Sequence, residues 1–396
     1  MNWCDRVSPL VRSIPPSGIR KFFDVAAEMD NVISLGVGEP DFVTPWHIRD
    51  MCVDGLHNGY TSYTSNYGLL ELREEIARTM FNDYGLRYDP RREILVTVGV
   101  SEALDLAMRA ILSPGDEVLV PEPCYVSYKT CVTLAGGRPR PVATVLDNEF
   151  KVTVEQLTAA LTPRTKALLI GYPNNPTGTI MTRNELLAIA RFAAQHDLIV
   201  ISDEIYSQLT YDSEPVCFAG LPEMRDRTIL LNGFSKAYAM TGWRIGYALS
   251  NPDFIAAMTK IHQYTMLCAP VTAQIAAIEA LRHGESSMRK MVHEYNCRRR
   301  LMIEGFHRIG LKCFEPKGAF YIFPSIKSTG RSSVAFAEEL LKQQKVAVVP
   351  GDAFGQCGEG FIRCSYATSP AKLSEALDRI NDFVNAGRQQ ASANRP

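Results

Sequence analysis

The sequence contains no apolar run long enough to cross a membrane, and residues 1–5 lack the basic region and apolar core that begin a signal peptide. It also has no excess of either charge, because 42 lysine and arginine residues nearly balance 43 aspartate and glutamate residues. There is no basic stripe and no long block of like charges. We therefore expect neither a membrane nor a nucleic acid among its partners.

The ten cysteines are scattered singly, without a C-x-x-C pair or a group of histidines and cysteines at zinc-binding spacing. This usage is typical of reduced thiols, so we expect a cytoplasmic protein without a metal site. The sequence also lacks a G-x-G-x-x-G turn between a strand and a helix. Its absence argues against a dinucleotide-dependent dehydrogenase.

What the chain does have is length and a large apolar fraction. With 396 residues, of which 46% are hydrophobic and 21% charged, we expect a globular protein of two domains. Short apolar runs alternate with helical patterns in the first two thirds of the chain, which predicts an α/β fold with a mostly parallel sheet covered on both faces. The predicted strands are residues 94–98, 118–120, 167–170, 198–201, 228–231 and 245–249.

The last third predicts a smaller α/β part. Residues 251–308 are largely helical, and apolar runs follow at 319–323, 346–349 and 361–366. A closing helix is predicted near 371–384, with apolar residues at helical spacing. We expect the last nine residues, RQQASANRP, to be frayed.

Residues with useful chemistry follow the predicted strands directly. Gly99, Tyr125, Asn175, Asp203 and Lys236 each lie just past the end of one strand. In parallel sheets, ligands bind beyond the carboxyl ends of the strands. A single lysine or aspartate is usually a solvated surface group, but five such coincidences predict a common site.

Residues 230–247, LLNGFSKAYAMTGWRIGY, indicate what this site could hold. Lys236 follows an apolar run by a few residues, and its amine can form a Schiff base with an aldehyde. Arg244 comes after the next turn, and its guanidinium can pair with phosphate oxygens. Together they favour a phosphorylated cofactor that is held covalently.

Four motifs in order carry a resemblance to a known family. They are GEPDF at 38–42, YPNNPTG at 172–178, SDEIY at 202–206 and SK…MTGWR at 235–244. The chain resembles the class I/II pyridoxal-phosphate-dependent aminotransferases of fold type I. With HQY at 262–264 and GAFY at 318–321, it is most similar to the bacterial aromatic and N-acetyl-diaminopimelate aminotransferases.

The resemblance implies a fold and a domain division. It implies a large cofactor-binding domain with a mostly parallel seven-stranded sheet between helices, and a smaller α/β domain built from both termini. The implied boundaries are 45–285 for the large domain and 286–396 for the small one, which residues 1–44 join.

The resemblance also implies catalytic roles. Lys236 would hold pyridoxal 5′-phosphate and then move the proton between Cα and the cofactor. Asp203 would face the pyridine nitrogen, Tyr206 and Asn175 would hydrogen-bond the phenolic oxygen, and Tyr125 would stack on the ring. Lys236, Asp203 and Tyr206 are the implied catalytic residues.

By the same resemblance, the phosphate would be bound by the amides of Val100 and Ser101 at a helix N-terminus, with Ser235 and Arg244 beside them. Tyr63 would reach the phosphate of a neighbouring subunit, which implies a homodimer with shared active sites.

One position departs from the family pattern. Gly233 stands where the family often has a phosphate-binding serine. Phosphate affinity is therefore expected to be weaker, or to be compensated by Ser235.

Substrate binding follows from the resemblance too. Arg363 would pair with the α-carboxylate, assisted by the backbone of Gly38 and by Asn175. We expect a ping-pong transfer of the amino group between an L-amino acid, aromatic or broad in range, and a 2-oxo acid such as 2-oxoglutarate. Ser101 occupies a position where some aspartate-specific relatives have a lysine. The residues expected to form an apolar side-chain pocket are Tyr63, Tyr67, Tyr125, Tyr264 and Phe320.

A second hypothesis keeps the cofactor and changes the reaction. A C–S β-lyase would use the same lysine, aspartate and phosphate-binding arginine, so the motifs alone leave it open. Arg363 and the detailed similarity favour transamination.

Overall fold

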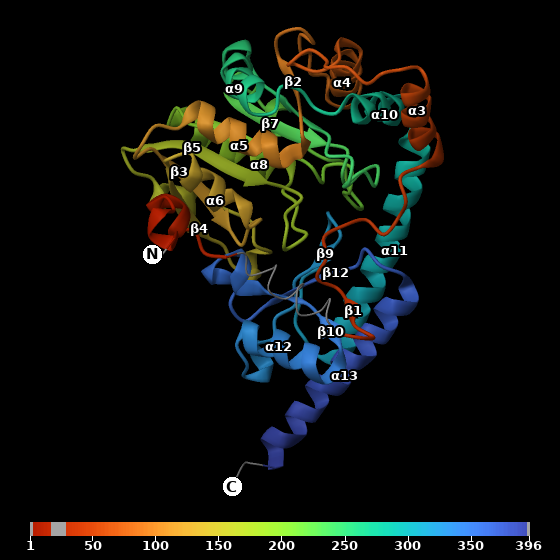
Figure 1. Ribbon diagram of the computed structural model, residues 1–396. Helices are drawn as coiled ribbons and strands as arrows, with labels where there is room; N and C mark the ends of the chain where they lie inside the picture. The colour runs from red at the N-terminus through yellow and green to blue at the C-terminus, as the bar shows by residue number, and fades with distance from the viewer. Residues whose placement is uncertain (1–2, 17–28, 394–396) are drawn as a thin grey trace.

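A seven-stranded sheet forms the centre of the computed structural model, which describes residues 3–16 and 29–393 (Figure 1). Every strand runs parallel to its neighbours except β8, which is antiparallel to both β2 and β7. This arrangement confirms the mostly parallel sheet. Across the sheet the strands are β2 (Ile94–Thr97), β8 (Gly246–Leu249), β7 (Thr228–Gly233), β6 (Ile199–Asp203), β5 (Thr165–Gly171), β3 (Glu117–Glu122) and β4 (Arg138–Ala143).

Helices cover both faces of this sheet. Neighbouring residues of a strand face opposite sides, and in β5 Ala167 and Leu169 pack with residues of α5 and α9, whereas Leu168 and Ile170 pack with residues of α8. The near-continuous apolar strands are thus explained by burial on two faces. The helices here are α3 (Trp46–His57), α4 (Leu70–Tyr84), α5 (Gly99–Ile111), α6 (Ser127–Leu134), α7 (Val154–Ala160), α8 (Arg183–Gln195), α9 (Pro252–Thr265) and α10 (Val271–His283).

A second group of strands lies at the other end of the protein (Figure 1). In it, β12 pairs antiparallel with both β9 and β11, and β1 pairs parallel with β10. Its strands are β1 (Ile33–Ser34), β9 (Tyr321–Ile322), β10 (Val346–Ala347), β11 (Val349–Pro350) and β12 (Ile362–Ser365), and its helices are α11 (Glu285–Ile309), α12 (Ser333–Gln344) and α13 (Pro370–Ala393).

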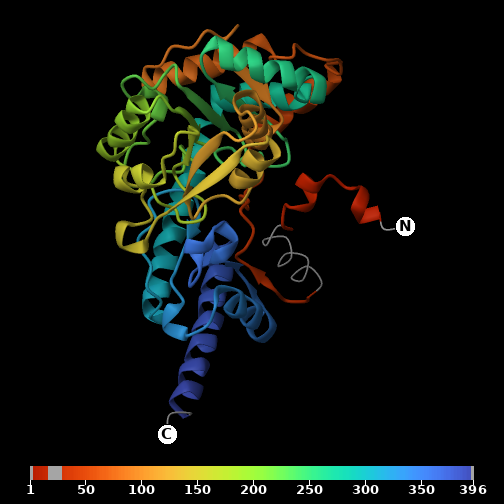
Figure 2. The same cartoon turned by 90° about the vertical axis from the view of Figure 1, so that its left-hand side faces the viewer.

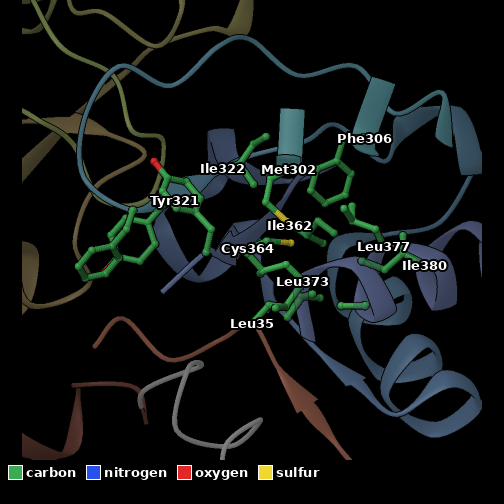
Figure 3. Close-up of a cluster of buried hydrophobic side chains, with 14 of the residues drawn as sticks. Leu35, Met302, Phe306, Tyr321, Ile322, Ile362, Cys364, Leu373, Leu377 and Ile380 are labelled. Carbon is green, nitrogen blue, oxygen red and sulfur yellow. The ribbon is translucent and has the colours of Figure 1, made fainter. Parts of the chain in front are cut away.

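The core of this smaller part contains residues from both the N-terminal and the C-terminal segments of the chain. Figure 3 shows Leu35, from the N-terminal segment, beside Leu373 of α13, with Met302 and Phe306 of α11 in the same cluster. Residues 33–35 and α13, from opposite ends of the chain, therefore both belong to the smaller part, as expected, whereas α1 (Pro9–Arg12) contacts α6 of the larger part. The boundaries at 44/45 and 285/286 stay a prediction, and residues 17–28 of the first segment lie outside the described residues.

Three details differ from the sequence-based expectations. Strand β4 was not predicted, because its sequence RPRPVA has no apolar run; prolines are tolerated there since β4 lies at the edge of the sheet. The single strand expected at 346–349 is divided into β10 and β11. The expected fraying of the C-terminus was wrong for residues 388–393, because α13 continues to Ala393.

Figure 2 shows two segments that project from the body of the protein. One is the end of α13, and the other is residues 3–16, which contain the short helix α1 (Pro9–Arg12). Among the described residues, no helix is both long and apolar enough to cross a membrane.

Candidate active site

A cavity of 470 Å³ lies beyond the carboxyl ends of the parallel strands, and all the residues predicted to bind the cofactor or the α-carboxylate except Tyr63 line it. Its size suits a small ligand. A larger hollow of 650 Å³ lies near the start of α8 and contains none of the predicted site residues. The lining of the first cavity includes Gly38, Val100, Ser101, Tyr125, Asn175, Asp203, Tyr206, Ser235, Lys236, Arg244 and Arg363.

Lys236 reaches this cavity from the turn after β7. Its Nζ donates a hydrogen bond of 2.7 Å to the carbonyl oxygen of Gly38. Burial lowers the pKa of Lys236 to about 8, because the charged amine loses its hydration; Glu39 opposes this change, whereas the charge of Arg363 adds to it. Above pH 8 the amine is therefore mostly neutral, which is the form that attacks an aldehyde.

Asp203 is the last residue of β6 and is almost fully buried. Its carboxylate accepts hydrogen bonds from the Tyr128 hydroxyl, at 2.8 Å, and from the backbone N–H of Ile205, at 3.2 Å. Burial raises the pKa of Asp203 above its ordinary value, although both hydrogen bonds act in the opposite direction. Because both donors are neutral, a cationic group in the cavity would stabilise the ionised carboxylate strongly.

The N-terminus of α5 forms one wall of the cavity. Unlike α8 and α9, which are capped by the side chains of Thr182 and Asn251, α5 has no side-chain cap, so its first N–H groups can serve a ligand. Gly99 opens this helix with a φ of 76°. A side chain at Gly99 would collide with the Arg244 guanidinium, whose nearest nitrogen lies 2.6 Å from an added Cβ. The glycine thus permits Arg244 to lie against the helix start, where both attract an anion.

Arg363 is a buried cation whose hydrogen bonds go to neutral oxygens. It donates to Asn175 Oδ1, at 2.9 Å, and to the carbonyl oxygen of Gly36. Its guanidinium lies over the rings of Tyr321 and Phe354, at 4.6 and 4.9 Å from the ring centres, and its Nε is buried without a partner. A buried guanidinium with an unused donor fits a site for a carboxylate ligand.

Gly233 lies where the chain has no room for a larger residue. A Cβ at this position would come within 2.9 Å of Gly246 Cα and 3.0 Å of the Ile245 carbonyl oxygen. Serine here would therefore require the neighbouring strand to shift. Ser235, in contrast, lines the cavity.

Several predicted residues lie outside the cavity. Tyr63 and Tyr264 are 82% and 87% exposed, and neither Tyr67 nor Phe320 lines the cavity. Phe320 is fully buried in the core of the smaller part. The expected aromatic pocket is therefore wrong for Tyr67 and Phe320, Tyr125 lines the cavity, and the places of Tyr63 and Tyr264, exposed in a single chain, stay a prediction.

Two further tyrosines, Tyr128 and Tyr321, line the cavity and were not among the predicted site residues. Tyr128 lies in the first turn of α6, three residues after Tyr125, which precedes the helix, and the two rings make an edge-to-face contact at 5.7 Å between centres. Tyr321 was visible only as part of the GAFY phrase. The hydroxyl of Tyr321 lies against that of Tyr206, which is remote in the sequence, so no local pattern indicated that Tyr321 belongs to the site.

The donor set fits pyridoxal 5′-phosphate. The start of α5 and Arg244 suit the phosphate, the buried carboxylate of Asp203 suits a protonated ring nitrogen, and the Lys236 amine suits the aldehyde. Arg363, with its unpartnered Nε, is left for a substrate carboxylate. No cluster of three or more metal-ligating side chains occurs in residues 3–16 and 29–393.

Comparisons with known proteins agree with this assignment. The family model described as "Aminotransferase class I and II" matches residues 30–380. The chain is 56% identical to the "Putative aminotransferase YugH" of Bacillus subtilis over 96% of its own length and 98% of that protein. It is 48% identical to an aspartate aminotransferase of Pyrococcus abyssi, with 94% and 96% covered. The crystal structure of an aromatic aminotransferase from Pyrococcus horikoshii superimposes with a TM-score of 0.89, at 43% identity and with 93% and 99% covered.

Proposed function

The chain belongs to the class I and II aminotransferases, a family that depends on pyridoxal 5′-phosphate, and we propose that it moves the amino group of an aromatic L-amino acid to a 2-oxo acid such as 2-oxoglutarate. The observation that carries this proposal is the convergence of Lys236, Asp203, Arg244 and Arg363 on one cavity. When bound, the cofactor supplies an electron sink for the electrons released as the substrate Cα–H bond breaks.

Lys236 both holds the cofactor and moves a proton. Its Nζ is the only lysine nitrogen among the cavity-lining residues that the structure describes, so the covalent bond and the proton transfer at Cα both fall to it. Asp203, whose orientation is fixed by the hydrogen bond from Tyr128, would stabilise a proton on the ring nitrogen of the bound cofactor.

Arg363 orients the substrate. Its planar guanidinium can pair with both carboxylate oxygens, and Asn175 already fixes one of its nitrogens. Because both half-reactions begin with an α-carboxylate bound at one place, donor and acceptor occupy the cavity alternately, which gives a ping-pong sequence. Gly38 lies beside this position, with its carbonyl oxygen bonded to Lys236.

The rest of the cavity favours an apolar side chain. Leu104, Val126, Ile205 and Tyr125 line it, and its three cations, Lys236, Arg244 and Arg363, are all assigned to other groups. Within the described part of one chain, neither an aspartate side chain nor the distal carboxylate of 2-oxoglutarate would find a further cation there, so this lining supports the choice of an aromatic donor and not the choice of acceptor. The named relatives include both aromatic and aspartate aminotransferases, so the donor must be measured.

A panel of amino donors tests this proposal. With 2-oxoglutarate as acceptor, we expect kcat/KM for phenylalanine and tyrosine to exceed that for aspartate at least tenfold, which corresponds to about 1.4 kcal/mol of binding to an apolar wall. Keto-acid formation should stop after one turnover per site when no acceptor is present. A donor that continues to form keto acid and ammonia without acceptor would instead support the β-lyase, and a preference for aspartate would overturn the proposed specificity.

We further propose that the enzyme is a homodimer in which the subunits share their active sites. Tyr63 is 82% exposed in a single chain, and its loop lies beside the C-terminal end of α9, which carries Tyr264, since Asn66 donates to the carbonyl oxygen of Leu267 just after this helix. Met266 is exposed in the same place. An exposed cluster of large apolar side chains is typical of an interface.

Mixed dimers provide the test of shared sites. Lys236→Ala chains and Tyr63→Asp chains should each form nearly inactive homodimers, because the second change places a carboxylate against the phosphate. Random mixing makes about half of the dimers mixed, and one of their two sites carries neither change, so roughly a quarter of wild-type activity should return.

A matched control uses Tyr60→Asp, which changes another exposed tyrosine of the same loop. This variant should stay active by itself. If mixing Lys236→Ala with Tyr63→Asp restores nothing, Tyr63 serves its own chain and the shared-site proposal is wrong.

We also propose that the protein works in the cytoplasm. No disulfide joins any of the ten cysteines, all of which lie in the described residues, and three of them, Cys124, Cys217 and Cys364, are buried. Ten cysteines without a disulfide suit a reducing compartment.

A further inference from the structure

Tyr321 connects two parts of the active site. Its hydroxyl lies 2.8 Å from the hydroxyl of Tyr206, and both side chains are buried. Figure 3 shows Tyr321 at the margin of the cluster in the smaller part, with its oxygen directed away from the aliphatic side chains. The hydroxyl thus leaves the apolar core and enters the lining of the cavity.

Three features fix the position of Tyr321. Its backbone pairs with Ser365 in β12, two residues from Arg363. The Arg363 guanidinium lies over its ring at 4.6 Å from the ring centre, a cation–π contact. Gly38 gives its hydroxyl room, because a Cβ at that position would come within 2.3 Å of the oxygen.

We propose that Tyr321 is a positioning residue that links the carboxylate-binding Arg363 to Tyr206 and keeps the Tyr206 hydroxyl aimed at the ring oxygen of the cofactor. This inference rests on the proposed function of the cavity. Tyr321 touches neither the ring nor the reacting atoms in this scheme, and it acts through Tyr206.

Tyr321 can orient the Tyr206 hydroxyl because the two hydroxyls share a single hydrogen bond. Each hydroxyl has one proton to donate, and the short contact between them uses one. When Tyr321 donates to Tyr206, the Tyr206 proton is free for an acceptor in the cavity, and the incoming bond makes it a stronger donor. Burial raises the pKa of both hydroxyls, so both keep their protons near neutral pH.

A donor to the ring oxygen favours the form of the bound cofactor in which the Lys236 nitrogen has lost its proton, because that form has more negative charge on the oxygen. Weakening this donor therefore raises the pH at which the nitrogen is half-protonated. The charged groups that act on Lys236 are Glu39, Asp203, Arg244 and Arg363, and a change from tyrosine to phenylalanine at 321 alters none of them.

The test compares Tyr321→Phe with Tyr295→Phe in the cofactor-loaded enzyme. Tyr295 belongs to the same buried cluster, and its hydroxyl has no partner among the described residues. The measurement is the pH midpoint of the visible absorption change. We expect Tyr321→Phe to raise the midpoint by about half a pH unit, as suits the loss of one indirect hydrogen bond, and Tyr295→Phe to leave it within a tenth of a unit.

A double-mutant cycle distinguishes an effect that acts through Tyr206 from a general loss of structure in the Tyr321→Phe variant. If Tyr321 acts only through Tyr206, adding Tyr321→Phe to Tyr206→Phe should cause no further shift. An unchanged midpoint in Tyr321→Phe, an equal shift in Tyr295→Phe, or additive shifts in the double variant would each overturn the proposal. A wild-type enzyme without a pH-dependent visible band would instead contradict the proposed role of Lys236 itself.

Discussion

Replacing Lys236 with alanine should abolish turnover while the protein still binds pyridoxal 5′-phosphate. The groups proposed to bind the phosphate and the ring nitrogen, at the start of α5, Arg244 and Asp203, are untouched by the change, so we expect affinity for the cofactor to fall only by the loss of the covalent link. Catalysis loses its acid–base group at Cα, which alone contributes about 10²–10⁴-fold. Borohydride reduction followed by mass spectrometry should find the cofactor on the Lys236 peptide of the wild type and on no peptide of the variant.

Lys260→Ala is the matched control, since Lys260 lies exposed on α9. It should keep wild-type activity and cofactor content. An Lys236→Ala enzyme that retains a substantial fraction of wild-type turnover would show that another residue moves the proton, and the assignment of this lysine would be wrong.

The residues that the sequence placed at strand ends are also the ones that the structure brings together. Asp203 ends β6 and Lys236 follows β7, and these strands pair in parallel, so the proximity of the two residues follows from the strand pattern alone. The convergence of Gly38 and Arg363 could not be derived in this way. It depends on β1 pairing with β10 and on β12 pairing with β9 and β11, and these short strands carry almost no periodic signal.

The missed features share a physical cause. Strand β4 has an exposed edge, so its sequence needed no apolar run to form it. Tyr128 and Tyr321 look like ordinary core tyrosines, because their rings are buried and only their hydroxyls reach a functional partner. The phosphate-binding departure at Gly233 was visible in the sequence, but its steric reason, the close approach of Gly246 on β8, required the structure.

Asp203 and Glu204 provide a comparison between two neighbouring buried carboxylates. Asp203 lines the cavity, whereas Glu204 accepts hydrogen bonds from the Ser202 hydroxyl and the Phe218 backbone N–H. Burial raises the pKa of Glu204 to about 7. If catalysis required only a buried carboxylate in this region, replacing Asp203 or Glu204 should have similar effects on activity.

Replacing Asp203 with asparagine should instead lower kcat/KM by more than tenfold, whereas Glu204→Gln should stay within a factor of three of the wild type. The amide can still accept the hydrogen bond from Ile205, so the fold is kept, but it cannot hold a proton on the ring nitrogen. A lost charge-assisted hydrogen bond of about 1.5–3 kcal/mol corresponds to about one to two decades in rate, and the weaker electron sink adds to this. Steady-state kinetics with the preferred amino donor, together with thermal unfolding of both variants, make the measurement. An Asp203→Asn enzyme as active as Glu204→Gln would mean that the ring nitrogen needs no anionic partner, and the role of Asp203 would have to be abandoned.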